Sequence, residues 1–282
     1  MDPITTMGAT IIVANKAYKV FEDLIYRRIY GVSKEELDAS NKEKAKDVTA
    51  LGEVKRDWIV KSEMIKIQRE YNNLGKTLNL SAPYIISEEN KIKEGDDLFW
   101  NILEHSKKIS NAEMQILIAK IIAGEYNNPK TYSMSTLQVL KSLDAKLVND
   151  FLNVLGVSID GIGVMQDVFS TVEEMKILNV SYVTLLELQN IGLISSNPSI
   201  IKSEETVTGV YLNKQIHFTV KDVANNKEFN VPGFYSLTNA GKEIARHLNV
   251  KENTNFLSWL EKKYKDNTFN NINIIIINDN EN

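Results

Sequence analysis

The sequence predicts a mainly α-helical protein, α+β overall, with a small antiparallel sheet toward its C-terminal end. Apolar residues recur at helical spacing behind capping residues through most of the first 155 positions. Alternating, β-like runs occur only later, between 207 and 237 and again at 272–277. At 282 residues the chain is long enough for several domains, and we divide it into 1–80, 96–156 and 164–282.

The N-terminal region, 1–80, is expected to form long helices. Residues 9–30 have an amphipathic pattern, and their apolar run at 11–14 is too short to cross a bilayer. Ser33 and Glu36 fit a capping box that opens a polar helical stretch. Because the apolar stripe of that stretch is too thin to form a core, we expect a helical hairpin that self-associates, with contacts at Val48, Leu51, Trp58 and Ile65. The alternative is binding of residues 9–30 to a membrane surface.

The central region, 96–156, predicts a three- to four-helix bundle. Its longest helix covers 110–125, where Ser110 and Glu113 fit a second capping box. Gly124 follows the last apolar pair, at the position where a left-handed residue commonly ends a helix. Ser133 and Asp144 then begin two more short helices. The tight connections between these helices indicate a compact bundle.

The same region resembles a known family. The residues that carry the resemblance are Trp100, Ile109-Ser110-x-x-Glu113-Met114-Gln115, Ala119-Lys120-Ile121-x-Ala123-Gly124-Glu125, Pro129 and Ser133-x-x-Thr136-Leu137. They are similar to the uncharacterised bacterial domain of unknown function 2806 family over about 96–156, and more weakly at 235–245. Ile118 stands where that family commonly has Trp, and Tyr132 replaces a Phe. The resemblance implies no catalytic residues, and a similar layout in abortive-infection proteins suggests phage defence by analogy.

The C-terminal region, 164–282, combines helices with a predicted hairpin. Ser181 caps a helix over 182–190, and β-like runs follow at 207–212, 215–220 and 229–237, with a turn expected at 225–226. Thr238 then caps a final helix that runs to about 248. Two helices, a β-hairpin and a helix in this order resemble a winged-helix module. The tail at 272–277 is expected to add an edge strand to the sheet, or to pair with a partner chain.

Winged helices often bind DNA, but this one lacks the usual charges. The predicted recognition helix at 182–190 has no Lys or Arg, and the net charge of the chain is −4. The nearest nucleic-acid contacts would be Gln189, Asn190, Lys214 and Lys227. We therefore favour a structural or protein-binding module and keep a DNA-binding regulator as the alternative.

The sequence offers no convincing catalytic, metal or cofactor site. There is no Cys, the three His are far apart, and no phosphate-binding glycine pattern is present. Glu113 and Glu125 lie about 18 Å apart on one predicted helix, too far for an acid–base pair. The loop that follows that helix is the expected contact surface, with Glu125, Tyr126, Asn127, Asn128, Lys130 and Tyr132.

These patterns predict a bacterial, non-enzymatic interaction protein that forms a homo-oligomer or binds a protein partner. Because no signal peptide is recognised, a cytoplasmic location is expected. A phage-defence role, DNA binding by the winged-helix-like module, and membrane association through residues 9–30 are the functional hypotheses that follow.

Overall fold

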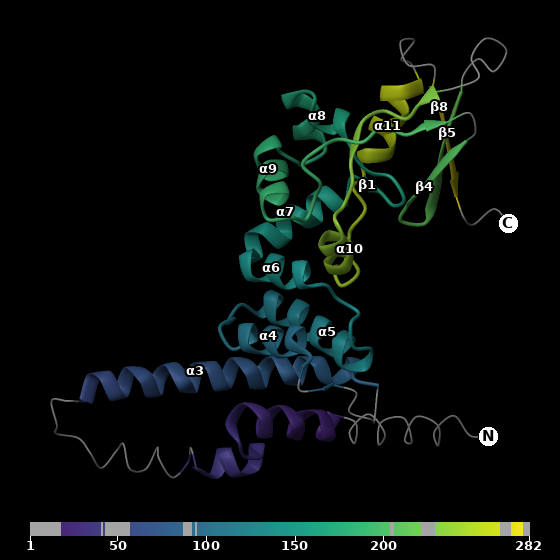
Figure 1. The fold of residues 1–282 in the computed structure, drawn as a ribbon. Coiled ribbons are helices and arrows are strands. Elements are labelled where there is room, and N and C mark those ends of the chain that lie inside the picture. Colours follow the sequence, from purple (N-terminus) through teal and green to yellow (C-terminus); the bar gives the residue numbers. More distant parts are fainter. Residues whose placement is uncertain are drawn as a thin grey trace, which may run out of the picture. The chain divides into compact units, whose positions relative to one another are not determined.

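A computed structural model describes residues 18–40, 42, 57–86, 92–93, 95–203, 206–220, 229–265 and 272–278. The chain divides into two compact units, Met1–Leu137 and Gln138–Asn282 (Figure 1). Both units are rich in helices, and short antiparallel strands occur in the second, so the predicted mainly α, α+β class is confirmed. The division falls inside helix α6 (Met134–Ser142), and therefore inside the segment 96–156 that we expected to form one bundle.

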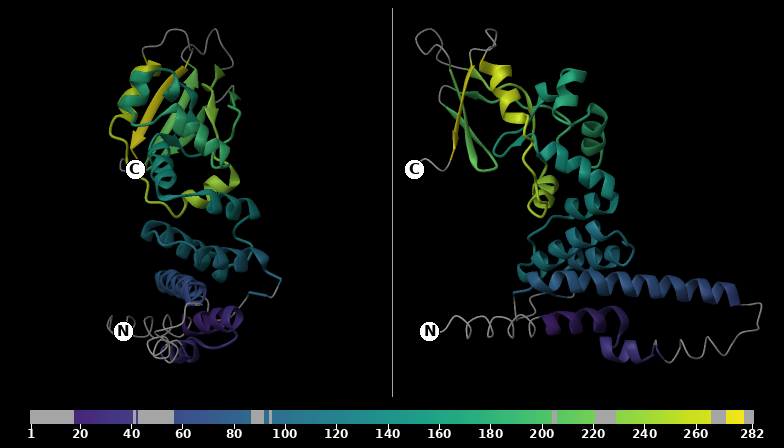
Figure 2. Two further views of the ribbon diagram at one scale, coloured as in Figure 1. Left: turned by 90° about the vertical axis from the view of Figure 1, so that its left-hand side faces the viewer. Right: turned by 180° about the vertical axis from the view of Figure 1, so that it is seen from behind.

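The first unit is built from helices. Residues 18–30 and 34–40 are helical, and α3 (Asp57–Ser81), the 3-10 turn η1 (Ala82–Tyr84), α4 (Asp97–Ser106) and α5 (Ala112–Asn127) follow. The predicted capping box is confirmed, because Ser33 N donates to Glu36 Oε2 at 2.7 Å and Glu36 N donates to Ser33 Oγ at 3.3 Å. Figure 2 shows the helix of residues 18–30 (purple) lying along α3.

Aromatic side chains join the N-terminal helix to the rest of this unit. The Phe21 and Tyr126 rings meet edge to face with centroids 4.7 Å apart, and Tyr26 contacts Tyr71 of α3 in the same way at 5.8 Å. Phe21, Ile25 and Tyr26 are fully buried. Most of the apolar face of residues 18–30 is therefore covered by the protein itself, although Val20 is 42% exposed, and residues 9–17 lie outside the described part.

The start of α5 differs from the prediction by one residue. Asn111, not Ser110, is the N-cap: its side chain accepts a hydrogen bond from Met114 N at 3.0 Å, and Glu113 is exposed. Ser110 Oγ instead accepts from Asn73 Nδ2 at 3.3 Å, which ties α5 to α3. Adjacent Ser and Asn are both good caps, so sequence alone could not choose between them.

The predicted end of α5 is also wrong. The helix continues past Gly124 to Asn127, and Gly124 keeps a helical backbone. A Cβ at this position would lie less than 3.0 Å from the Tyr132 hydroxyl and 3.1 Å from two atoms of its ring. Gly124 is therefore required by the close approach of Tyr132, and not by a left-handed helix end.

After the end of α6, the described residues of the second unit contain five α-helices and a set of short strands. The helices are α7 (Ala145–Leu155), α8 (Val172–Ile177), α9 (Tyr182–Asn190), α10 (Asn239–Ala245) and α11 (Phe256–Lys265), with a 3-10 turn η2 (Gln166–Phe169). The caps predicted at Asp144, Ser181 and Thr238 are confirmed, since each side chain accepts a hydrogen bond from the backbone N–H three residues on.

The strands form three small antiparallel sheets. The first has the order β1 (Ser158–Ile159), β2 (Gly163–Met165), β7 (Phe234–Tyr235), and the second pairs β3 (Lys202–Ser203) with β6 (Phe229–Asn230). The third has the order β4 (Val207–Tyr211), β5 (Lys214–Val220), β8 (Ile272–Asn278). The tail strand therefore joins the hairpin β4–β5 as the neighbour of β5. The turn expected at 225–226 lies outside the described residues, and the run at 229–237 pairs with β3 and β2 and not with β5. The run at 229–237 is not one strand, because Pro232 and Gly233 break it into β6 and β7.

Candidate functional site

The exposed face of α9 is the clearest candidate for a contact surface. Tyr182, Val183 and Leu186 share this face, with 49%, 65% and 42% of their surface exposed. The opposite face carries Leu185 and Leu188, which are fully buried and hold the helix to its unit. Both faces of this nine-residue helix are thus apolar, although only one is needed for packing.

The polar residues around α9 are engaged within the second unit. Glu187 forms a salt bridge with Lys146 of α7, whose Nζ lies 3.1 Å from its carboxylate. Gln189 Nε2 donates to the carbonyl of Ser195 at 2.8 Å, so its amide supports the turn that follows the helix. Asn190 is exposed at the last position of the helix.

The four residues predicted to contact nucleic acid do not form a basic surface. Gln189 is used in the fold, and Lys214 of β5 forms a 2.9 Å salt bridge with Glu252. Lys227 lies outside the described residues. Asn190 is exposed at the end of α9, and the helix itself carries no Lys or Arg, so it gives phosphate groups no cation to bind there.

The loop after α5, predicted as a contact surface, is organised around a buried carboxylate. Glu125 is 2% exposed, and its two oxygens accept hydrogen bonds from Lys130 N at 2.6 Å and Tyr132 N at 3.2 Å. Burial raises the Glu125 pKa, against the effect of these hydrogen bonds. Lys130 adopts a positive φ of 70°, which turns the backbone N–H groups toward the carboxylate. Glu125 thus holds the loop in place.

This arrangement removes most of the predicted loop residues from the surface. Tyr126 and Tyr132 are buried along with Glu125, because they fill the core beside α5. Asn127 accepts a hydrogen bond from Ile86 N and donates one to the Tyr84 carbonyl. Of the six predicted residues only Asn128 and Lys130 are exposed. Lys130 lines a hollow of about 310 Å³ together with residues such as Asp96 and Met134.

The predicted association residues are only partly described. Val48 and Leu51 lie outside the described residues, and of Trp58 only the backbone, in α3, is described. Ile65 is 69% exposed on the same helix. Among the described residues no helix is long and apolar enough to cross a membrane, and no group of three or more His, Cys, Asp or Glu could hold a metal ion.

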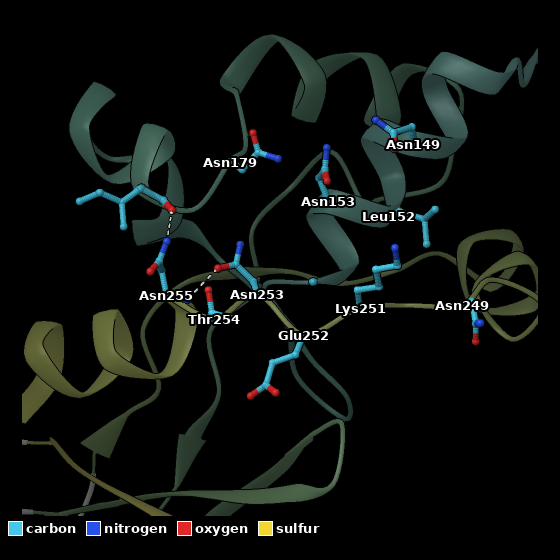
Figure 3. A pocket seen from close by; sticks show the side chains of 12 residues that line it. Asn149, Leu152, Asn153, Asn179, Asn249, Lys251, Glu252, Asn253, Thr254 and Asn255 are labelled. Atoms are coloured by element: carbon cyan, nitrogen blue, oxygen red, sulfur yellow. Dashed lines mark hydrogen bonds between the residues drawn. The ribbon is translucent and has the colours of Figure 1, made fainter.

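A pocket that the sequence analysis missed lies in the second unit. It has a volume of about 390 Å³ and is lined by asparagines from three segments: Asn149, Asn153, Asn179, Asn249, Asn253 and Asn255 (Figure 3). Asn253 and Asn255 donate side-chain hydrogen bonds to the carbonyls of Leu178 and Ile177, at 2.8 and 2.9 Å. The residues between 249 and 255 are rich in Asn, but Asn149, Asn153 and Asn179 are far from them in sequence.

Carboxamides limit what this pocket can do. They donate and accept hydrogen bonds but neither take up nor release protons at ordinary pH, so they bind polar groups without acid–base chemistry. Lys251 projects toward α7, whereas Glu252 points away from the other labelled side chains (Figure 3). Two of the six amides are already part of the fold, which makes this pocket in part a structural joint between α7, α8 and the segment before α11.

Comparison with known proteins identifies a family but no activity. The family model described as "Protein of unknown function (DUF2806)" matches residues 58–261. This chain belongs to that family. The match confirms the resemblance and extends it well beyond 96–156, into both compact units. No curated protein and no solved structure matches the chain.

Proposed function

We propose that this member of the family is a bacterial, cytoplasmic, non-enzymatic interaction protein, whose winged-helix-like second unit binds a protein partner through α9. The exposed face of α9 carries the proposal, because it offers three large apolar side chains where a DNA-reading helix would offer cations. Burying one such side chain contributes about 1.5–3 kcal/mol. A Tyr flanked by aliphatic residues is also a typical centre of a protein–protein contact.

The composition of this face makes DNA binding the weaker proposal. Phosphate contacts come mainly from Lys and Arg, yet Lys146 beside α9 is already bound to Asp150 and Glu187. Base recognition would fall to Asn190 alone on the exposed side of the helix. An apolar partner surface, by contrast, matches Tyr182, Val183 and Leu186 together.

Membrane association is likewise less well supported by the described residues. A membrane-surface helix needs a free apolar face, but Phe21 and Ile25 are buried inside the first unit. A role in phage defence remains a proposal by analogy with abortive-infection proteins, and phage plating on cells with and without the gene would test it.

Site-specific photocrosslinking tests the proposed surface. A photoreactive amino acid in place of Val183 should give a discrete protein adduct in cells, and the additional change Leu186→Glu should abolish it. The same probe at Val172, which is 73% exposed on α8, is the control and should give no such adduct. The proposal fails if Val183 gives no discrete adduct, or if Leu186→Glu leaves the adduct unchanged.

A further inference from the structure

Strand β8 forms one edge of the sheet β4-β5-β8. All seven of its residues pair with β5, from Ile272 opposite Val220 to Asn278 opposite Lys214. No other described strand pairs with β8, and Figures 1 and 2 show it (yellow) beside β5 on the outer side of the sheet. Every second residue of an edge strand directs its backbone N–H and C=O away from the sheet, so β8 offers a ready pairing edge.

The two edges of this sheet differ. At the β4 edge, Asp160 N donates to the Val210 carbonyl at 2.7 Å, and Val210 N donates to the Asp160 carbonyl at 3.0 Å. This bridge at Val210, next to the close approach of Gly209 to Ile159, covers the second half of β4. The β8 edge has no such bridge to a described residue, so it is the edge at which the sheet can be extended.

β8 also lacks the features that normally prevent pairing between edges. Its sequence, INIIIIN, contains no Lys, no other charged residue and no Pro. Ile272 and Ile274 are buried toward the helix α11, which packs on this strand. Ile275 and Ile277 lie on the opposite face, with 46% and 41% of their surface exposed. The strand therefore exposes an apolar face together with its pairing edge.

The strand is complementary to itself. If two copies run antiparallel about a two-fold axis at Ile275, that residue meets its own equivalent and Ile274 meets Ile276. Asn273 then faces Ile277, and Ile272 faces Asn278. No charge is placed opposite an apolar or like-charged residue in this register, whereas a charged partner strand would leave its charges beside isoleucine. The sequence thus fits a second copy of itself.

We propose that β8 pairs antiparallel with β8 of a second copy of this chain, which joins two three-stranded sheets into one of six strands. The exposed Ile275 side chains would pack together at the axis, about 4.5–5.5 Å apart at their Cα atoms. This inference goes beyond the proposed contact at α9, because it names a second copy of this chain as the partner of a separate surface. It is independent of α9, since the two surfaces use different residues.

Sedimentation of the full chain tests the pairing. We expect a dimer at micromolar concentration for the unmodified protein, and a monomer for Ile275→Lys, because two ammonium groups would meet at the axis. Val210→Lys is the matched control: it places the same charge on an exposed position of the same sheet, beside the covered edge, and should leave the dimer intact. Thermal melts followed by circular dichroism verify that each variant folds.

Charge exchange makes the test specific to the axis. Ile275→Glu alone should also be monomeric, but mixing it with Ile275→Lys should restore a dimer that contains one copy of each. If neither variant at 275 folds, Ile277→Lys replaces them. It places an ammonium group opposite Asn273 on the pairing edge and should weaken the dimer, and an unchanged dimer would overturn the proposal. An unmodified protein that stays monomeric at high micromolar concentration overturns the proposal, and so does a dimer that survives Ile275→Lys. The crosslink from Val183 is unaffected by either result, so failure of the β8 pairing and failure of the α9 proposal are distinguishable.

Discussion

The close approach between Gly124 and Tyr132 yields the most detailed stability prediction. In Gly124→Ala the new methyl group would overlap the Tyr132 hydroxyl, at less than 3.0 Å, and would lie 3.1 Å from two ring carbons. Tyr132 cannot simply move away, because it is buried and its backbone N–H donates to the buried Glu125 carboxylate. The substitution therefore forces a rearrangement of the loop around Glu125.

Two opposing contributions set the size of the effect. Replacing a helical Gly by Ala stabilises a helix by about 1 kcal/mol. Overpacking a well-packed site costs about 1–3 kcal/mol. Because the overlap involves a buried ring that is held at its backbone, we expect the steric cost to prevail and Gly124→Ala to lose up to about 2 kcal/mol of unfolding free energy. Removing the hydroxyl with Tyr132→Phe takes away the closest contact, so adding Gly124→Ala to that variant should be close to neutral.

Urea unfolding followed by circular dichroism measures this coupling, with the two compact units fitted as separate transitions. Gly75→Ala in α3 is the matched control, because its methyl group would lie 3.3 Å from the Tyr26 hydroxyl and needs only a small adjustment. We expect Gly75→Ala to be neutral or slightly stabilising. The reasoning is refuted if Gly124→Ala is equally destabilising with Tyr132 and with Phe at that position.

Three further predictions concern the second unit. Tyr211→Phe should lower the unfolding free energy measured in urea by about 1–3 kcal/mol, because the buried hydroxyl accepts a hydrogen bond from Asn253 N at 2.9 Å. Tyr182→Phe on the exposed face is the control and should leave this free energy unchanged; equal effects of the two changes would contradict the prediction. Burial opposes ionisation of Glu174, but hydrogen bonds from Lys263, Ser170 and Thr171 outweigh it and lower its pKa from 4.5 to about 2. The ionised Glu174 side chain therefore stabilises the fold fully above pH 4.5, and this contribution is lost as the pH falls toward 2. The difference in melting temperature between wild type and Glu174→Gln should shrink over that range. A constant difference would count against the assignment. A labelled DNA duplex should show no binding at low salt and micromolar protein, and salt-sensitive binding there would revive the DNA hypothesis.

Local sequence rules predicted many of the elements correctly. Caps such as Ser33, Asp144 and Ser181 depend on contacts within a few residues, and each is where the sequence placed it. The Asn111 cap was missed because Ser110 beside it is equally suitable by type, and only the bond from Asn73 shows what Ser110 does. Short-range chemistry therefore identifies an element well and its first residue less well.

Features that depend on distant residues were harder to predict. The local sequence predicts a helix end at Gly124, because nothing in its neighbourhood reveals that the Tyr132 ring lies against it. The loop after α5 looked exposed because it is polar, yet Glu125 turns inward to bind backbone N–H groups. The asparagine pocket joins residues about one hundred positions apart, which no spacing rule connects.

The central claim is that α9 contacts protein and not nucleic acid, and the crosslinked species formed from position 183 tests it most directly. After crosslinking in cells, the adduct is divided and treated with protease or with nuclease, and its mass is compared before and after. The account predicts a protein adduct that nuclease leaves unchanged and that Leu186→Glu eliminates. An adduct that nuclease shortens, or one that forms equally well with Leu186→Glu, would contradict it.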